Sequence, residues 1–333
     1  MSRAKEMGRV ATLLAAALLS LAPVATAATP PSQFDDFQSG LKLAVQAQKA
    51  FDQGAYDWAE ALDEQALPLF ERALGPEDLR IVGPLASLAD VYRTRGKLDR
   101  AELLYRRLAF LMEKAFGPSD IRVADALASA AEAVVGQGHQ GQAKELYARA
   151  LAIRQVALGP DSPKVLPVLS NLADVDAAIG QFEEAASLYR RARQISEKAF
   201  GPEDLAVAGP LDGEAAAETA RGRLEPAEVL YRRELAIIEQ AFGPSNVHTA
   251  YVLNLLVDLY IDAGRYGEAE PLYRRSLAIL EARFGANHAR VTAFREKYAA
   301  LLLKVGPEPT ARREAPRSST AGRPAEDRGS VVR

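Results

Sequence analysis

The sequence contains no cysteine and only three histidines, so few reactive or metal-binding sites can be built from it. Without cysteine there can be no disulfide, no thiolate metal site and no cysteine nucleophile. His139, His248 and His288 lie far apart in the sequence, whereas a zinc site needs three or four converging ligands. A glycine-rich phosphate loop, a His-Glu-x-x-His metal motif and a Gly-x-Ser-x-Gly nucleophile motif are also missing. We therefore expect a protein that is not an enzyme and that binds no cofactor or metal.

Long hydrophobic runs are scarce. An apolar run of 13 residues at Val10–Ala22 is too short to cross a bilayer core of about 30 Å as a helix. A short basic region that includes Arg3 and Arg9 precedes this run, and small residues follow it up to Ala27, which is the layout of a secretory signal peptide. We expect residues 1–27 to be removed and the mature protein to be periplasmic or secreted, with no transmembrane span. The alternative is an uncleaved N-terminus that anchors the protein in a membrane.

The body of the chain also lacks an excess of positive charge. The formal net charge is −3; residues 1–27 carry three basic residues and one acid, and residues 307–333 carry six arginines and four acids, which leaves −7 for the residues between them. Nucleic-acid binding needs a basic face, so we expect no nucleic-acid partner. The segment 307–333 is rich in Pro, Arg, Ser and Gly and poor in core residues, and we expect it to be a disordered tail.

What the sequence does contain is a strict repeat of 42 residues. Glycine recurs at this interval, and proline follows the first five of these glycines; the positions are Gly75, Gly117, Gly159, Gly201, Gly243 and Gly285. A tyrosine series keeps the same period at Tyr105, Tyr147, Tyr189, Tyr231 and Tyr273. A leucine series does so at Leu85, Leu127, Leu169, Leu211 and Leu253. A fixed period between about 20 and 50 residues is typical of solenoids.

Each period divides into two helical patterns, here called helix A and helix B. Apolar residues recur at three- and four-residue steps in both, and a glycine separates them. Because glycine closes a helix and proline does not continue one, the Gly-Pro pair predicts the end of helix B. Pro84, Pro167 and Pro210 fall near the predicted start of helix A, and we expect these helices to begin late rather than to kink.

The segment LNLLVDLYIDAGRYGEAEPLYRRSLAIL, Leu253–Leu280, resembles a tetratricopeptide repeat. The period of 42, the Leu/Phe-Gly-Pro linker and the Leu-Tyr-Arg-Arg phrase are similar to the kinesin-light-chain subtype. The resemblance implies an all-α fold, a right-handed α-solenoid of antiparallel helix pairs over residues 33–306, after a short linker at 28–32. It would hold six tetratricopeptide repeats plus a C-terminal capping helix. Terminal repeats of solenoids need polar outer faces, and we expect such caps at both ends.

Pairs of arginines repeat on helix B and allow two interpretations. They are Arg106-Arg107, Arg190-Arg191, Arg232-Arg233 and Arg274-Arg275. They could form a basic stripe for an anionic partner. However, Glu102, Glu228 and Glu270 precede the first arginine of their pairs by four residues, the favourable order for a helix ion pair. We favour this structural role.

In tetratricopeptide arrays, helix A lines a concave surface that binds peptides, and the resemblance carries this role to particular residues here. They are Asp90, Glu132, Asp174 and Asp258 in one column, Ser170, Asp212 and Asn254 in a second, and Asp125 and Tyr251 in a third; Asn171, with Asn254, partly matches the asparagine pair of kinesin-light-chain repeats. Acidic residues dominate these columns, and a negative surface favours basic peptides. We expect a monomeric, non-catalytic scaffold that binds a basic peptide or protein segment. The alternative is a structural envelope protein that stacks end to end.

Overall fold

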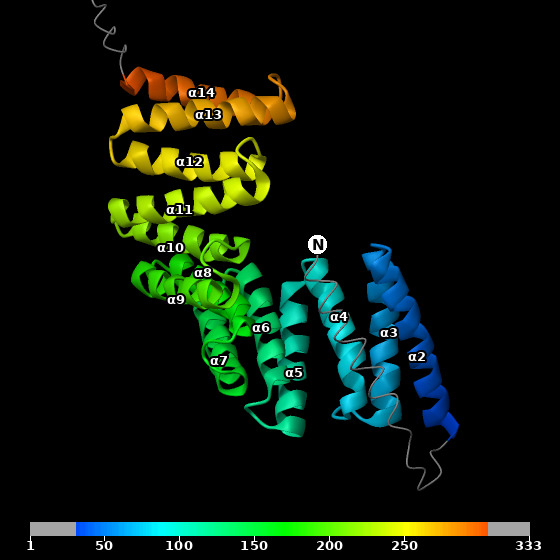
Figure 1. The fold of residues 1–333 in the computed structure, drawn as a ribbon. Helices are drawn as coiled ribbons and strands as arrows, with labels where there is room; N and C mark the ends of the chain where they lie inside the picture. Colours follow the sequence, from blue (N-terminus) through cyan, green and yellow to red (C-terminus); the bar gives the residue numbers. More distant parts are fainter. Residues whose placement is uncertain (1–30, 306–333) are drawn as a thin grey trace, which may run out of the picture. The chain divides into compact units, whose positions relative to one another are not determined.

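The computed structural model describes residues 31–305, and every regular element within them is helical (Figure 1). The chain divides into two compact units, Met1–Pro244 and Ser245–Arg333, each with its own set of packed helices. The expected signal peptide at 1–27 and the expected tail at 307–333 lie outside the described residues. The all-α solenoid fold predicted from the 42-residue period is confirmed.

Five helix pairs make up the described part of the first unit. They are α2 (Pro31–Asp52) with α3 (Tyr56–Leu74), α4 (Val82–Thr94) with α5 (Leu98–Phe116), α6 (Ile121–Gly136) with α7 (Gln140–Leu158), α8 (Leu166–Ala178) with α9 (Phe182–Phe200), and α10 (Ala208–Ala220) with α11 (Leu224–Phe242). Each helix packs on the next one in the chain (Figure 1). One pair cannot bury its apolar face alone, so the stacked neighbours share a continuous core.

The second unit holds the sixth helix pair, α12 (Val247–Asp262) and α13 (Tyr266–Phe284), followed by α14 (Ala289–Val305). These elements correspond to the sixth repeat and the single final helix that the sequence predicts. The hydroxyl of Tyr273 donates a hydrogen bond of 2.9 Å to the carbonyl of Phe294, and the two rings stack with centroids 4.4 Å apart. The last helix is therefore packed on α13 as a capping helix.

The linker between repeats ends one helix and begins the next. Gly75 and its counterparts adopt φ between 86° and 101°, a conformation open to glycine but costly for other residues. Three residues later a side chain accepts a hydrogen bond of 2.8–3.4 Å from the backbone N–H two positions on, and these caps are Asp78, Asp120, Ser162, Asp204 and Asn246. In the last linker Nδ1 of His288 takes this place, with 3.2 Å to the N–H of Arg290. Capping satisfies a backbone donor that would otherwise have no partner.

Proline shortens helix A in three of the repeats. Where the sequence has Pro84, Pro167 or Pro210, helix A has 13 residues and a three-residue 3₁₀ turn precedes it, at Leu79–Ile81, Pro163–Val165 and Leu205–Val207. The proline-free helices α6 and α12 have 16 residues. The late start puts each proline among the first helical positions, where no intrahelical N–H bond is lost. The predicted late helix starts are confirmed.

The predicted leucine column is buried in both units. Leu85, Leu127, Leu169 and Leu211 in the first unit, and Leu253 in the second, are at most 4% exposed, whereas their counterpart on α14, Arg295, is exposed. The first helix departs in part from the expected polar cap. Most exposed residues of α2 are polar, among them Gln38, Lys42 and Gln46, but Phe34 and Val45 are 57% and 63% exposed, so the outer face is polar only in part.

The first arginine of each helix B pair has the structural role that the sequence favours. Arg106, Arg232 and Arg274 pair with Glu102, Glu228 and Glu270 four residues before them. Arg190 has Ala186 at that position and reaches instead to Glu214 and Glu218 on α10, at 2.9 and 3.1 Å. The four arginines therefore stabilise the helices and do not form a free basic stripe.

In the first unit, the second arginine of each pair joins one repeat to the next. Arg107, Arg191 and Arg233 donate from Nη2 to the carbonyl of the linker proline 31 residues earlier, Pro76, Pro160 and Pro202, at 2.6–2.9 Å. Arg107 and Arg233 also pair with a glutamate 36 residues earlier on the preceding helix B, Glu71 and Glu197. We call the bond from the arginine to the carbonyl of the linker proline the arginine–linker contact. The Gly-Pro phrase and the Arg-Arg phrase are thus two halves of one interaction.

Replacing Arg107 by alanine should destabilise the first unit more than replacing its neighbour Arg106. Arg107→Ala removes the bond to the Pro76 carbonyl and the ion pair with Glu71, for a loss of about 1–2 kcal/mol. Arg106→Ala removes one exposed i,i+4 pair, worth about 0.3–0.5 kcal/mol. Thermal unfolding followed by circular dichroism measures the difference. Equal melting temperatures for the two variants would contradict an inter-repeat role for Arg107.

Candidate functional site

Three of the predicted acidic residues, one per repeat, form a column along the helices A of the first unit. Asp90 lies on α4, Glu132 on α6 and Asp174 on α8. Asp90 is half-buried, and Glu132 and Asp174 are exposed. We call Asp90, Glu132 and Asp174 the acidic column. The structure therefore brings together, within one unit, the carboxylates that the 42-residue spacing predicts to be related.

Tyrosines from helix B lie next to the carboxylates of the acidic column. The hydroxyl of Tyr105 donates to Oδ1 of Asp90 at 2.5 Å, and the hydroxyl of Tyr189 donates to Oδ1 of Asp174. Tyr147 lies between these two repeats, where the charges of both Glu132 and Asp174 act on its hydroxyl. Each of the three tyrosines is therefore placed with its ring inside the helix pair and its hydroxyl toward the acidic column.

The electrostatics keep these tyrosines protonated. Burial raises the pKa of Tyr105, Tyr147 and Tyr189, and the neighbouring carboxylates raise it further. The hydroxyls therefore remain hydrogen-bond donors at neutral pH. Burial also raises the pKa of Asp90, while Tyr105 and Arg93 oppose this shift; Nη2 of Arg93 lies 3.6 Å from Asp90. Because Asp174 accepts from a neutral donor, that hydrogen bond holds its carboxylate in place without neutralising its charge.

Other predicted residues of the first unit have mixed positions. Asn171 donates from Nδ2 to the Tyr147 hydroxyl at 3.3 Å, and Ser170 beside it is half-buried. Asp212 is half-buried on α10, and its charge acts on Tyr189. Asp125 pairs with Nη2 of Arg154 at 2.6 Å, so its charge is compensated within the protein. Asp125 is therefore a weaker candidate for partner binding than Asp174.

The remaining three predicted residues lie on α12 in the second unit. Tyr251 is 53% exposed, and Asp258 is exposed and feels the charge of Lys297 on α14. Asn254 is half-buried, and its Oδ1 has no hydrogen-bond partner among the described residues. These three residues form a candidate surface of their own unit.

Sequence reasoning missed a set of buried carboxyl groups. Asp63 is 1% exposed and stands where later repeats have tyrosine; Ser87 donates to its Oδ2 at 2.7 Å and its Oδ1 has no partner. Burial raises the pKa of Asp63 to about 7 against the effect of Ser87. Glu234 is 4% exposed where other repeats have alanine, leucine or serine, and burial, helped by Asp212, raises its pKa to about 8. At both positions the signal in the sequence was an acidic residue where the other repeats have a different residue type.

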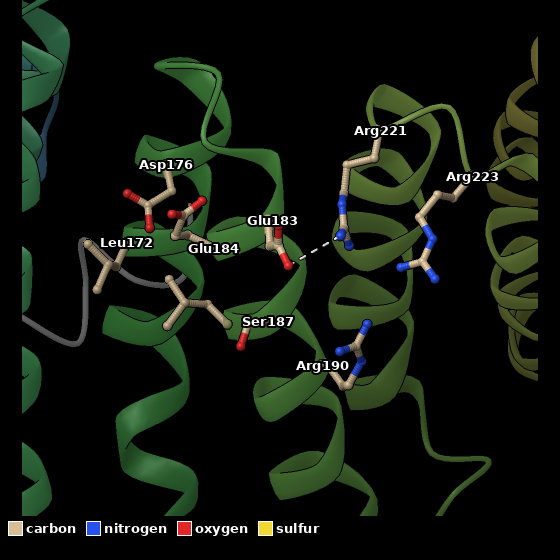
Figure 2. Close-up of a pocket in the computed structure, with 9 residues that line it drawn as sticks. Leu172, Asp176, Glu183, Glu184, Ser187, Arg190, Arg221 and Arg223 are labelled. Atoms are coloured by element: carbon tan, nitrogen blue, oxygen red, sulfur yellow. Dashed lines mark ion pairs between the residues drawn. The ribbon is translucent and has the colours of Figure 1, made fainter.

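A hollow lies in the fourth and fifth repeats. It has a volume of about 580 Å³ and is lined by residues of α8, α9 and the α10–α11 turn, among them Leu172, Glu183, Glu184, Arg190, Arg221 and Arg223. Figure 2 shows the acidic side chains on one side of the hollow and the three arginines on the other. Glu218, nearly fully buried on α10, contacts all three arginines.

Two further findings concern residues 31–305 alone. No helix in this range is both long enough and apolar enough to span a bilayer. No group of three or more histidines and carboxylates in this range could hold a metal ion.

Replacing Asp63 by asparagine should stabilise the protein at high pH and not at low pH. The folded pKa of about 7 lies above the ordinary value of 3.8, so the wild type loses stability as pH rises between these values. One pKa unit corresponds to about 1.4 kcal/mol, which sets an upper bound of about 4 kcal/mol on the gain of Asp63→Asn above pH 8. Melting temperatures from pH 4 to 9 measure the effect, with Asp35→Asn on the exposed face of α2 as the control. A pH-independent difference from wild type would contradict the assignment.

The comparisons with known proteins agree with this architecture. A family model described as tetratricopeptide repeat matches residues 141–198 and 207–282, and a second model with the same description matches residues 85–116. A search of curated protein sequences found no match. Proteins built of tetratricopeptide repeats generally mediate protein–protein interactions and are generally non-catalytic.

Solved structures show the same fold. One is a Podosopora anserina protein described as a kinesin light chain with nearly identical TPR-like repeats: TM-score 0.55, 22% identity, 60% of this chain and 94% of that chain covered. A second is BtubC (BKLC) from P. vanneervenii: TM-score 0.50, 20% identity, with 91% of this chain and 100% of that chain covered. A third is aspartyl phosphate phosphatase F from Bacillus subtilis: TM-score 0.53, 12% identity, with 83% of this chain and 74% of that chain covered. At these identities the similarity shows the fold alone, an all-α solenoid, and the family models show tetratricopeptide repeats over the residues that they match.

Proposed function

We propose that the protein is a non-catalytic scaffold whose acidic column binds a basic peptide or protein segment. The observation that carries this proposal is the exposed carboxylate of Asp174, held by the hydroxyl of Tyr189. A carboxylate fixed by a neutral donor keeps its charge and loses little conformational freedom when a cation binds. Preorganisation of this kind lowers the cost of binding.

The repeat extends this feature along the first unit. Glu132 and Asp90 occupy the equivalent positions on α6 and α4, so one carboxylate in each of the second, third and fourth repeats faces the same side of the stacked helices. Lysine or arginine side chains of an extended segment, or its N-terminal ammonium group, would pair with these carboxylates. Asn171, Ser170 and Asp212 lie on the same helices and would supply further hydrogen-bonding groups.

In the second unit, Tyr251, Asn254 and Asp258 on α12 offer a carboxylate, an amide and an exposed aromatic ring. We include them in the proposal as a separate contact surface. An aromatic ring beside a carboxylate suits a basic side chain, because the ring face also attracts cations.

We also propose that the protein is exported, to the periplasm or outside the cell. The support is the sequence pattern of residues 1–27 alone. Mass spectrometry of the protein recovered from its native host would show a chain that begins at Ala28. A full-length chain held in the membrane fraction would instead support the uncleaved anchor.

One observation favours a second function, end-to-end association. Phe34 and Val45 expose apolar surface on α2, the first described helix, where another repeat would pack. Light scattering at increasing concentration tests this alternative. A monomer mass that does not change with concentration, and that is the same in the wild type and in the double variant Phe34→Ser/Val45→Ser, would eliminate it.

Binding of an oligolysine peptide should depend on Asp174 and on salt. Asp174→Lys replaces an attraction by a repulsion within one site, and we expect affinity to fall at least about tenfold, equivalent to about 1.4 kcal/mol. Glu203→Lys makes the same change of charge on an exposed linker residue outside the acidic column and serves as the control. Fluorescence anisotropy at low and at physiological ionic strength measures both variants. Equal losses for the two variants would mean that net charge, and not the acidic column, attracts the peptide.

A further inference from the structure

In the first repeat, the position that corresponds to the hollow between α8, α9 and the α10–α11 turn is filled by a glutamate side chain. There, Glu60 on α3 is 6% exposed, and its carboxylate pairs with Nη1 of Arg95 at 2.7 Å and with Nζ of Lys97 at 2.5 Å. In the second repeat Glu102 has the same position and accepts a hydrogen bond of 2.8 Å from Gln137. In these repeats a glutamate of helix B fills the space beside the next A–B turn.

The fourth repeat lacks this glutamate. Three periods after Glu60 the sequence has Ala186, while the counterparts of Arg95 and Lys97 are Arg221 and Arg223. The two cationic side chains have been kept and the glutamate of helix B has been lost, and Glu218 on α10 contacts both arginines instead. The hollow of about 580 Å³ lies beside these arginines.

The contacts left to the arginines are long and shared. Arg221 lies 3.2 Å from Glu218 and 3.5 Å from Glu183, and Arg223 lies 3.5 Å from Glu218. Arg190 contacts the same Glu218 at 3.1 Å. Glu218 is therefore shared by three guanidinium groups, but Arg190 also has Glu214 at 2.9 Å and Arg221 has Glu183, so Arg223 has the weakest contacts of the three. The side chain of Arg223 is 53% exposed, so it can bind a further oxyanion.

The opposite wall selects among anions. Glu183 is 80% exposed and pairs with Arg221, and Glu184 is exposed beside it; Figure 2 shows Glu184 farther from the arginines, on the side of Asp176. Asp176 on this side pairs with Lys144 at 2.7 Å. A simple anion near Arg223 would be repelled by the two glutamates. A ligand that also carries a cationic group would match both walls.

We propose that this hollow binds a zwitterionic ligand of short-peptide size, whose carboxylate takes the place that Glu60 has in the first repeat and whose ammonium group faces Glu183 and Glu184. The site is separate from the acidic column and does not depend on the function proposed for it. A hollow of this volume falls in the range of small-ligand sites.

The test uses three peptides that differ only in their end groups. Triglycine carries both charges, N-acetyl-triglycine only the carboxylate, and triglycine amide only the ammonium group. We expect isothermal titration of the full chain to show triglycine binding at least about tenfold more tightly than either blocked peptide, since each blocked peptide loses one charge-assisted contact. Equal binding of all three peptides, or no binding of triglycine, would overturn the proposal.

Variants locate the binding in the hollow. Ala186→Glu restores the side chain of the first two repeats and should abolish triglycine binding by pairing with Arg221 and Arg223. Arg223→Ala should weaken binding about tenfold without filling the space, and it remains informative if Ala186→Glu does not fold by circular dichroism. Arg106→Ala removes an exposed helix B arginine of the second repeat and should leave binding unchanged. Unaltered affinity in Arg223→Ala would refute the site.

A fourth peptide identifies the source of the zwitterion. N-acetyl-Glu-Gly-Lys-amide carries its two charges on side chains, as a segment of a longer protein would. Binding of this capped peptide, lost in Ala186→Glu, would support the site and indicate a protein segment as its ligand. Binding of triglycine alone would support the site and indicate free peptides.

Discussion

The arginine–linker contact is the interaction on which the regularity of the first unit depends. A guanidinium group on helix B holds the carbonyl of the linker proline in the preceding repeat, and in two cases also a glutamate of the preceding helix B. The contact fixes the distance between a helix end and the next helix pair. Both partners recur every 42 residues, and the contact occurs at the linkers of Pro76, Pro160 and Pro202, while Arg149 in the third repeat pairs with Glu113. The repeated geometry also keeps the buried leucines and tyrosines at equivalent positions in successive repeats.

The acidic column follows from this regularity. Tyr105 and Tyr189 can each hold a carboxylate 15 residues earlier only if helix A and helix B of a pair keep one mutual position. The ring of Tyr189 packs so closely on Gly213 that an added Cβ there would lie 2.3 Å from it. The tyrosines are therefore both core residues and hydrogen-bond donors to the surface. Packing and surface charge are coupled through the same side chain.

Much of the fold could be predicted from the sequence, because glycine, proline and leucine act locally and recur. The helix pairs, the late helix starts at Pro84, Pro167 and Pro210, and the buried leucines all follow from spacing. The pairing of Asp125 with Arg154, and the bond from Arg107 to Pro76, could not, since they join residues about 30 positions apart whose approach depends on helix packing. The hollow could be predicted only in part. Ala186 breaks a pattern visible in the sequence, but the hollow also depends on Arg221 and Arg223 having only the longer contacts with Glu218.

The 3₁₀ turns have a consequence for how such a chain can change in length. A three-residue turn followed by a helix of 13 residues occupies the same stretch as an uninterrupted helix of 16 residues. Copies with and without proline are thus interchangeable in length. A duplication or deletion of 42 residues, begun at any point in the repeat, would leave every remaining arginine with a linker carbonyl to bind. Genetic recombination between copies could therefore lengthen or shorten the array while each junction keeps its geometry, and new surfaces could arise by altering single positions such as Ala186.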